Sequence, residues 1–319
     1  MARFCVTGGC GFIGSHLSAA LIARGHSVRV LDDLSTGSRA NLAPGAALLR
    51  GDIADPADAR AAMDGVDGCF HLAAIASVER GVQDWPGTHR VNLSGTVAIL
   101  DAARAHRVPV VYASSAAVYG DGPVLPIPED APTRPLSAYG ADKLGCEQHA
   151  RVAGAVHGIP TLGLRFFNVF GPRQDPRSPY SGVISIFCDR LVRGNAVEVF
   201  GDGEQTRDFV YVGDVVAALL AAMPAASTAA PVLNLCTGQP TSVRALAATV
   251  AALCGTPLTL NHRPPRAGEI RHSLGAPDRA REALGLATPT SLRDGLAEVV
   301  AWLKAGSPGL AVPAGEPSV

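Results

Sequence analysis

The sequence predicts an α/β protein with a doubly wound parallel sheet and a second, smaller α/β domain. In the first half of the 319 residues, short runs of β-branched residues alternate with longer runs rich in alanine and leucine, which is the pattern of βαβ units. A glycine-rich turn connects the first of these strands to the first helix. After residue 170 the pattern becomes irregular and rich in proline, which indicates a change of domain.

The expected elements follow the chain in order. We expect strands at 3–7, 27–32, 47–50, 68–72, 108–113, 161–166 and 232–236. We expect helices at 14–24, 137–156 and 183–193, and a strand edge followed by a helix at 208–223. Gly25 should end the first helix, because glycine readily adopts the left-handed conformation.

The domain boundaries follow from these elements. Residues 1–170 and 210–236 form the predicted dinucleotide-binding domain, and residues 171–209 and 237–305 form the predicted substrate-binding domain. Residues 306–319 show no pattern of hydrophobic residues, and we expect a flexible tail there.

Composition argues against several classes of protein. The 27 basic and 28 acidic residues give a net charge of -1 without a long run of one sign, which argues against nucleic acid or an anionic membrane as a partner. The sequence has no apolar stretch long enough to span a bilayer and no apolar block at its start, so we expect a cytoplasmic protein. The seven cysteines contain no C-x-x-C pair and the nine histidines are dispersed, so we expect neither a disulfide framework nor a metal site.

Three glycines mark a dinucleotide site. Gly8, Gly11 and Gly14 stand three residues apart where the first strand turns into the first helix. Glycine lets the backbone approach a pyrophosphate, whose charge is met by the N–H groups at the helix start. Turns also collect glycine for steric reasons alone, so the site is predicted from the strand before it, the helix after it and the acid that follows.

That acid is Asp32, at the end of the second expected strand. Its carboxylate can accept both hydroxyls of an adenosine ribose, which favours NAD over NADP. Arg39 leaves NADP open, and a solvated loop carboxylate is the alternative role for Asp32. Asp52 follows the third strand and could accept the amino group of adenine or simply lie in a turn. His71 is expected to be a packed, hydrogen-bonded core histidine.

The candidate catalytic residues lie in the middle of the chain. Tyr139 and Lys143 form a Y-x-x-x-K pattern, and a spacing of four residues puts both on one face of a helix. An ammonium beside a phenol favours the phenolate, which is what a general base for a sugar hydroxyl requires. Ser115 ends the fifth strand and could bind the reacting oxygen; Ser114 and Ser115 could instead cap the following turn.

Together these motifs resemble the extended short-chain dehydrogenase/reductase superfamily, which has a Rossmann fold, and within it the UDP-glucose and UDP-N-acetylglucosamine 4-epimerases. The resemblance extends over nearly the whole chain. It is carried by residues 7–14 (TGGCGFIG), 31–37 (LDDLSTG), 114–120 (SSAAVYG), 139–143 (YGADK), 165–173 (RFFNVFGPR) and 207–214 (RDFVYVGD).

The resemblance implies an NAD-dependent enzyme that inverts C4 of a UDP-hexose through a transient 4-keto sugar. It implies that Tyr139 is the base, that Lys143 orients the ribose and tunes the tyrosine, and that Ser115 binds the reacting oxygen. A non-catalytic sensor of NAD or nucleotide sugar is disfavoured, because all three residues are present. The expected cofactor-binding residues are Gly8, Gly11, Phe12, Ile13, Gly14, Asp32, Asp52, Ile53, Leu72, Ala73, Ala74, Asn92, Ser114, Tyr139 and Lys143.

The resemblance also implies a set of sugar-nucleotide contacts. Arginine suits this role because its planar fork matches phosphate oxygens. At the position aligned with Ser273, a small residue admits an N-acetyl group in the related enzymes, which points to UDP-GlcNAc and UDP-GalNAc beside the plain hexoses. The expected substrate-binding residues are Ser77, Ser115, Tyr139, Asn168, Arg207, Arg266, Glu269 and Ser273.

Other reactions and assemblies stay open. Related 4,6-dehydratases carry an Asp-Glu pair where this chain has Ala116 and Ala117, so dehydration would lack its acid and base. A UDP-glucuronate 4-epimerase is an alternative, with Arg80 or Arg177 pairing with the substrate carboxylate. By resemblance we expect a homodimer formed by helices near 92–106 and 139–157.

Overall fold

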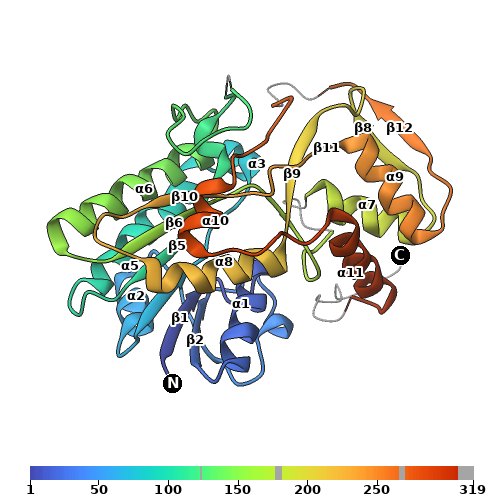
Figure 1. Ribbon diagram of the computed structural model, residues 1–319. Helices are drawn as coiled ribbons and strands as arrows, with labels where there is room; N and C mark the ends of the chain where they lie inside the picture. Colours follow the sequence, from blue (N-terminus) through green and yellow to red (C-terminus); the bar gives the residue numbers. More distant parts are fainter. Residues whose placement is uncertain (123, 177–181, 266–269, 308–319) are drawn as a thin grey trace.

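The computed structural model describes residues 1–122, 124–176, 182–265 and 270–307. Its centre is a seven-stranded sheet in which every neighbouring pair is parallel. The strands lie in the spatial order β3, β2, β1, β4, β5, β6, β10 (Figure 1). Their bounds are β1 (Arg3–Thr7), β2 (Ser27–Asp32), β3 (Ala47–Arg50), β4 (Gly68–His71), β5 (Val110–Ser115), β6 (Thr161–Phe166) and β10 (Val232–Leu235).

Helices cover both faces of this sheet, which confirms the doubly wound fold. Successive strand residues point to opposite faces: Val6 and Val30 pack with one layer of helices, and Cys5 and Leu31 pack with the other. A parallel sheet buried on both faces explains the nearly continuous apolar strands. The first layer holds α1 (Phe12–Ala23), α8 (Val212–Ala225) and α10 (Asp278–Leu284), and the second holds α2 (Pro56–Met63), α5 (Gly95–Ala103) and α6 (Ala138–His157).

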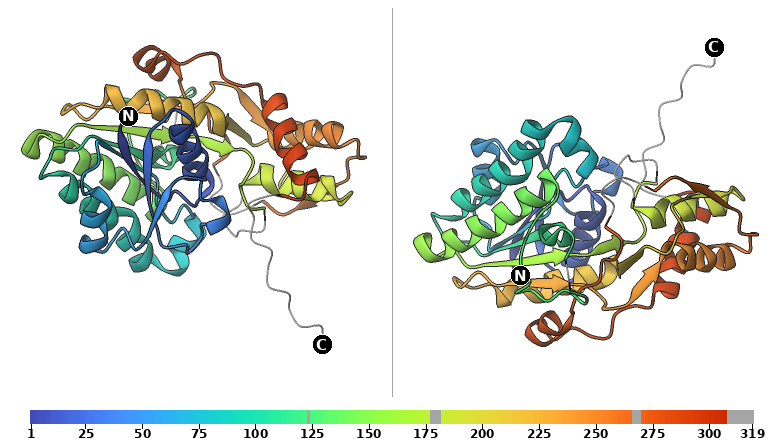
Figure 2. Two further views of the ribbon diagram at one scale, coloured as in Figure 1. Left: turned by 90° about the horizontal axis from the view of Figure 1, so that it is seen from below. Right: turned by 90° about the horizontal axis from the view of Figure 1, so that it is seen from above.

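A second lobe lies to one side of the sheet, as both views in Figure 2 show. It has its own hydrophobic core, in which Phe187, Leu246 and Leu296 are buried. A three-stranded sheet has the order β11, β9, β7, and β12 pairs with β8. The elements are β7 (Asn168–Phe170), α7 (Val183–Val192), β8 (Val197–Phe200), β9 (Thr206–Tyr211), β11 (Pro240–Ser242), α9 (Val243–Cys254), β12 (Leu260–Arg263) and α11 (Leu292–Lys304).

Short helical segments complete the described chain. They are the 3-10 turns η1 (Arg39–Asn41) and η3 (Ala116–Tyr119), the helices α3 (Val78–Gln83) and α4 (Trp85–His89), and the π-helical turn η2 (Arg90–Ser94). The predicted domain boundaries stay a prediction. Although it was assigned to the second domain, α10 packs against α8 and β10 of the first lobe.

The fifth strand differs from its expected position of 108–113. It begins two residues later, because the Val108 N–H donates to the Ala103 carbonyl and Pro109 has no N–H to give to a neighbouring strand. It ends later because Ser114 and Ser115 pair with Arg165 and Phe166 of β6. Both serines therefore belong to the strand itself, which fixes their directions.

The Asp208 carboxylate connects the two lobes. Asp208 lies on β9 in the second lobe and is fully buried. Its oxygens accept hydrogen bonds from the Thr237 N–H at 2.8 Å, the Thr237 hydroxyl at 2.6 Å and the Gly238 N–H at 2.9 Å, all just beyond β10 of the first lobe. Burial raises the pKa of Asp208 above its ordinary value, against the effect of these donors.

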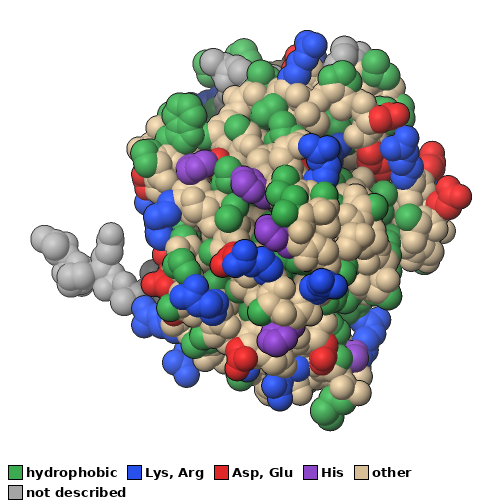
Figure 3. Space-filling model, turned by 90° about the vertical axis from the view of Figure 1, so that its left-hand side faces the viewer, with side chains coloured by type: hydrophobic (Ala, Val, Ile, Leu, Met, Phe, Trp, Pro, Cys, Tyr) green, Lys and Arg blue, Asp and Glu red, His purple; other side chains and the backbone are tan. Residues whose placement is uncertain are grey.

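The molecular surface opposite the second lobe is mixed in character. On this side, basic, acidic, histidine and hydrophobic side chains are interspersed, and no sign of charge forms a continuous field (Figure 3). Within the described ranges, no helix is long and apolar enough to cross a membrane.

Candidate functional site

A cleft of about 510 Å³ lies at the carboxyl ends of the parallel strands. This is where open α/β sheets bind their ligands. The glycine turn after β1, the ends of β2, β4 and β5, and the helix α6 form most of its wall. Asn168, Gln174 and Gly182, from the segments that lead into the second lobe, complete it. The cleft therefore has a side formed by the first lobe and a side that faces the second.

The glycine turn leaves room for a ligand close to the backbone. Gly8 has a φ of 70°, and a Cβ added there would lie 2.8 Å from the Ala73 nitrogen. A Cβ on Gly14 would collide with the Gly8 carbonyl oxygen. No side chain caps the start of α1 at Gly11, where Phe12 also lines the cleft. This uncapped helix start fits the pyrophosphate of a dinucleotide.

Asp32 lines the cleft beside the glycine turn. Its Oδ2 accepts from the Cys10 N–H and its Oδ1 from the Leu34 N–H, both at 2.9 Å. Burial raises the pKa of Asp32, although these two donors oppose the shift. A Cβ on Gly37 would lie 3.0 Å from Asp32 Oδ1, so the chain folds closely over the carboxylate. The carboxylate and the tight loop fit an adenosine ribose without a 2′-phosphate.

Asp52 and Ile53 both line the cleft beyond β3. Asp52 is also a turn residue, because its Oδ1 accepts from the Ala54 N–H at 2.9 Å. Its Oδ2 lies 2.7 Å from Arg90 Nη2. The two interpretations of Asp52, turn residue and cleft residue, are therefore compatible.

His71 is a buried core histidine, as the sequence suggested. The Thr7 hydroxyl accepts from the Leu72 and Ala73 N–H groups, both at 3.1 Å, so it donates its own proton to His71 Nδ1 at 2.8 Å. His71 Nε2 then donates to the Thr96 hydroxyl at 3.0 Å. Burial, helped by the charge of Lys143, lowers the pKa of His71 to about 3. The neutral ring thus holds the wall formed by Leu72 and Ala73.

The three predicted catalytic residues line one cleft. Ser115, Tyr139 and Lys143 all contribute to its wall. Lys143 Nζ lies 5.9 Å from the centre of the Tyr139 ring and donates to the Ala113 carbonyl at 2.8 Å. The Ser137 hydroxyl caps α6 by accepting from the Gly140 N–H at 3.1 Å, which fixes the start of this helix.

The two neighbouring serines of β5 differ in their partners. The Ser115 oxygen accepts from the Ala117 N–H at 3.2 Å, so Ser115 does cap the following turn while its O–H proton is left for another acceptor. Ser114 is buried and donates to the Glu147 carboxylate. Both serines contribute to the cleft wall.

Two predicted residues lie behind the wall of the cleft. Asn92 is buried, and its amide accepts from the Ile75 N–H at 2.8 Å and donates to the Ile75 carbonyl at 3.1 Å. Ser77 caps α3 by accepting from the Arg80 N–H at 3.0 Å. Neither is among the residues that form the wall. In the structure, Asn92 instead fixes the position of Ile75, which does line the cleft.

The predicted sugar-nucleotide contacts are more scattered. Asn168 lines the cleft, whereas Arg207 and Ser273 do not. Arg207 Nη1 donates to the Thr206 carbonyl at 2.8 Å, and the Ser273 N–H donates to the same carbonyl at 3.1 Å. Arg266 and Glu269 lie outside the described residues, as does Arg177. These substrate contacts stay predictions.

The cleft also contains residues that the sequence interpretation did not assign. The turn 35–37 lies beside Asp32, and its composition, Ser-Thr-Gly directly after the acid, is a usable signal. For Gln174 and Gly182, only their closeness to Asn168 in the sequence indicates a place in the cleft wall. The unassigned polar and small residues are Asp33, Ser35, Thr36, Gly37, Gly51, Ala76, Ala113, Gln174 and Gly182.

Comparisons with known proteins agree with this geometry. The model of the NAD dependent epimerase/dehydratase family matches residues 4–236. A UDP-glucose 4-epimerase of Mycolicibacterium smegmatis is 39% identical over 311 residues, which cover 95% of this chain and 98% of that protein.

Two solved structures are similar over nearly their whole length. The UDP-glucose 4-epimerase of Thermotoga maritima, with UDP-glucose, has a TM-score of 0.91 and 35% identity, covering 95% of this chain and 99% of that one. The UDP-N-acetylglucosamine 4-epimerase of Methanobrevibacter ruminantium, in complex with UDP-N-acetylmuramic acid, has a TM-score of 0.90 and 32% identity, covering 96% and 99%.

Proposed function

Since the chain belongs to the NAD-dependent epimerase/dehydratase family, we propose that it inverts C4 of a UDP-hexose through a transient 4-keto sugar. The observation that carries the proposal is the presence of Ser115, Tyr139 and Lys143 in the wall of the cleft that begins at the glycine turn. Bound between the glycine turn and Asp32, NAD would supply the hydride acceptor for the sugar carbon and, after the ketone has turned over, the hydride donor.

Each of the three residues has a distinct role in the proposal. Tyr139 removes the proton of the C4 hydroxyl as a phenolate and returns it after the ketone has turned over. Lys143 places its positive charge 5.9 Å from the centre of the Tyr139 ring and orients the ribose of the cofactor. Ser115 donates its O–H to the reacting oxygen, since its lone pair already accepts from Ala117.

The residues after Ser115 favour inversion over dehydration. Elimination of water from the sugar needs an additional acid and base near the reacting carbons. Ala116 and Ala117 begin the turn η3 directly after Ser115, and their methyl groups can neither give nor take a proton. We therefore expect the sugar to keep its C4 oxygen and the 4-keto intermediate to be reduced again within the cleft.

We extend the proposal to the substrate. The enzyme should accept UDP-GlcNAc and UDP-GalNAc, and UDP-Glc and UDP-Gal beside them, because the resemblance to related enzymes implies that a small residue at position 273 admits an N-acetyl group. Asn168, Arg207, Arg266 and Glu269 are the proposed contacts to the sugar nucleotide. The similarity to both a UDP-glucose and a UDP-N-acetylglucosamine 4-epimerase supports this pair of substrates.

The proposal is tested with the purified protein in a side-by-side assay of UDP-Glc, UDP-GlcNAc and UDP-glucuronate. We expect retained NAD, inversion at C4 of the first two substrates, and no net change in nicotinamide absorbance. Inversion of UDP-glucuronate alone would replace the substrate assignment. Net reduction of the sugar with release of oxidised cofactor, or net oxidation of the sugar with release of reduced cofactor, would contradict the epimerase reaction itself.

Two further expectations accompany this function. A homodimer formed through α5 and α6 stays a prediction, for which the exposed side chains of Val97, Val152 and Val156 on these helices offer apolar contact area. A cytoplasmic location also stays a prediction.

A further inference from the structure

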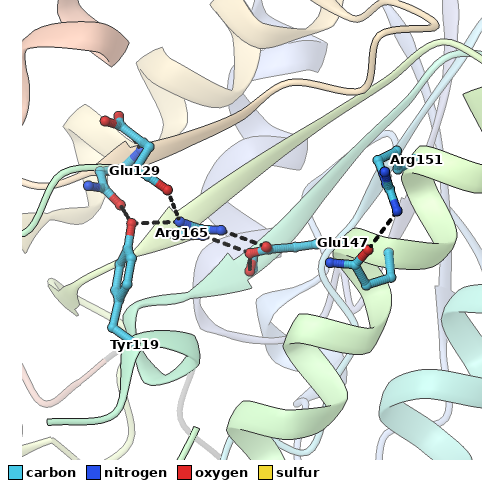
Figure 4. A network of polar contacts seen from close by, with 8 residues as sticks. Tyr119, Glu129, Glu147, Arg151 and Arg165 are labelled. Atoms are coloured by element: carbon cyan, nitrogen blue, oxygen red, sulfur yellow. Dashed lines mark hydrogen bonds and ion pairs between the residues drawn. The ribbon is translucent and has the colours of Figure 1, made fainter. Parts of the chain in front are cut away.

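A polar network centred on Arg165 joins several elements of the first lobe (Figure 4). At its centre, Arg165 of β6 and Glu147 of α6 form a two-pronged ion pair, with Nε to Oε1 at 2.8 Å and Nη2 to Oε2 at 2.7 Å. Their side chains are 7% and 5% exposed. Arg165 Nη1 also donates to the Tyr119 hydroxyl at 2.7 Å and to the Glu129 carbonyl at 2.9 Å.

The network reaches three further elements of the first lobe. Ser114 of β5 donates to Glu147. Tyr119 of η3 donates to Asn234 of β10 at 2.6 Å. Burial raises the pKa of Tyr119, against the charge of Arg165, so its phenol stays neutral and able to donate. The pair therefore connects α6 with β5, β6, η3 and β10.

Glu147 belongs to the same face of α6 as the catalytic residues. Tyr139, Lys143 and Glu147 follow one another at intervals of four residues, so their side chains lie along one stripe of the helix. Lys143 donates to the Ala113 carbonyl, and Glu147 accepts from the next residue, Ser114. Two consecutive turns of α6 are thus fastened to two consecutive residues of β5, directly before Ser115.

Stability alone is a poor explanation for this pair. Burying two charges removes their hydration, and well-packed apolar residues often replace a buried ion pair without loss of stability. Burial lowers the pKa of the Arg165 guanidinium, but the hydrogen bonds and charge of Glu147 outweigh it and raise this pKa above its ordinary value, so the pair stays ionised. What the pair adds is direction, because its fork allows one relative placement of β6 and α6.

We propose that Glu147 and Arg165 are positioning residues, whose ion pair holds the α6 stripe against the end of β5 so that Tyr139, Lys143 and Ser115 keep their mutual geometry. This inference rests on the proposed function, because it concerns the same three residues. Neither Glu147 nor Arg165 lines the cleft, so both act through their neighbours. Misplacement of reacting groups by about 1 Å can cost about a hundredfold in rate.

The pair also keeps the charges around Lys143 balanced. Without Arg165, the Glu147 carboxylate would be buried without a counter-charge, one helical turn from the Lys143 ammonium. It would then attract that ammonium away from the Ala113 carbonyl, to which Lys143 donates at 2.8 Å. Loss of Arg165 should therefore disturb the placement of Lys143 beside the Tyr139 ring as well as the placement of α6 against β6.

The test compares three changes in the full-length protein with NAD bound: Arg165→Lys, Arg165→Met, and the double change Glu147→Gln with Arg165→Met. The double variant removes both charges and keeps an acceptor for Ser114, so it remains informative if Arg165→Met alone does not fold. Arg193→Met serves as the control, since it breaks an exposed arginine–carboxylate pair with Asp189 on α7.

We expect Arg165→Lys and the double variant to lose roughly a hundredfold in kcat, with KM changed by no more than about twofold. Arg165→Met should lose at least as much kcat as Arg165→Lys. Hydrogen exchange in residues 138–147 should rise in each variant, whereas Arg193→Met should match the unmodified protein throughout. A double variant with unchanged kcat, or a loss that appears in KM and not in kcat, would reduce the pair to a structural role and overturn the inference.

The two proposals fail in different ways. If the unmodified protein does not invert C4, the proposed function falls, while the exchange of residues 138–147 still tests the positioning role. If the unmodified protein inverts C4 and all three variants behave like Arg193→Met, the positioning role falls and the proposed function stands.

Discussion

The two sides of the cleft are built in different ways. The side formed by the first lobe, where we propose that NAD binds, is the cofactor side. Main-chain groups and Asp32 form its wall: Gly8 approaches Ala73, Asp32 accepts from the Cys10 N–H, and the buried His71 pairs with Thr7, which holds Leu72 and Ala73. The side that faces the second lobe, where we propose that the sugar binds, is the sugar side, and there Asn168 is an exposed residue on a three-residue strand. On the cofactor side the sheet therefore fixes the shape of the wall, and we expect substitutions there to impair binding. On the sugar side, side chains can change without disturbing the sheet, and we expect substrate specificity to change with them.

The largest effect is expected where the two sides meet. Tyr139→Phe removes one oxygen and should lower kcat by roughly a thousandfold, because the reaction loses its general base. NAD should remain bound, since the cofactor side is unchanged. The measurements are the rate of C4 inversion and the NAD content of the purified protein, with Tyr211→Phe in the second lobe as the control. Near-normal turnover of Tyr139→Phe would remove the acid–base assignment.

The cofactor side should respond strongly to one methyl group. A Cβ at Gly14 meets the backbone of Gly8, which cannot move without opening the turn, so Gly14→Ala should weaken NAD binding by about tenfold to a hundredfold. In Gly81→Ala the nearest atom lies 3.5 Å away, at Ala138, and binding should be unchanged. Cofactor affinity measured by calorimetry on stripped protein decides this. Equal affinities would show that the turn is less confined than its geometry suggests.

His71 gives the cofactor side a dependence on pH. Its folded pKa is about 3, below the ordinary value of 6.5, so the unfolded chain takes up a proton first as the pH falls. The neutral ring contributes its full share to the free energy of unfolding above pH 6.5. Between pH 6.5 and pH 3 this contribution falls by about 1.4 kcal/mol per pH unit. Near pH 5 the loss is roughly 2 kcal/mol.

Urea unfolding at pH 7.5 and pH 5.0 measures this loss. His71→Gln cannot take up the proton, so its stability should fall less between the two pH values than that of the unmodified protein. His106→Gln, at an exposed histidine, should behave like the unmodified protein. If His71→Gln shows the same fall as well, protonation of His71 is not the cause.

The smallest effect is expected on the sugar side. Ser273→Tyr should lower kcat/KM for UDP-GlcNAc by about tenfold relative to UDP-Glc, because a bulky ring would occupy the space for the N-acetyl group. Ser273→Ala should leave the ratio unchanged. Loss of both activities to the same extent would mean that residue 273 does not select the substrate.

The same division explains what the sequence could predict. The ends of strands and the glycine turn depend on neighbours in the chain. The sequence therefore predicts the strand Thr161–Phe166 with the same bounds as the structure, and it also indicates the turn at Gly8. The predicted fifth strand begins and ends about two residues before the observed one. Only the folded sheet shows which residues beside Pro109 pair with the neighbouring strands. Contacts with distant partners were less accessible: the sequence does not show that the Asn92 amide pairs with Ile75, 17 residues away, and its contact with the cofactor stays a prediction.

The ion pair of Glu147 and Arg165 was missed for a related reason. Its partners stand 18 residues apart, on a helix and a strand, and no local pattern connects them. Two signals were nevertheless present. An arginine within the apolar run of Thr161–Phe166 must find a buried partner, and Glu147 continues the spacing of Tyr139 and Lys143 by another four residues.

The Asp208 carboxylate has a consequence for how the molecule unfolds. Its bonds to Thr237 and Gly238 connect the second-lobe strand β9 to the chain leaving the central sheet. Melting of the first lobe alone would remove the donors of the Asp208 carboxylate, and melting of the second lobe alone would leave those donors unpaired. Calorimetry should accordingly record a single heat-absorption peak, with both lobes lost together.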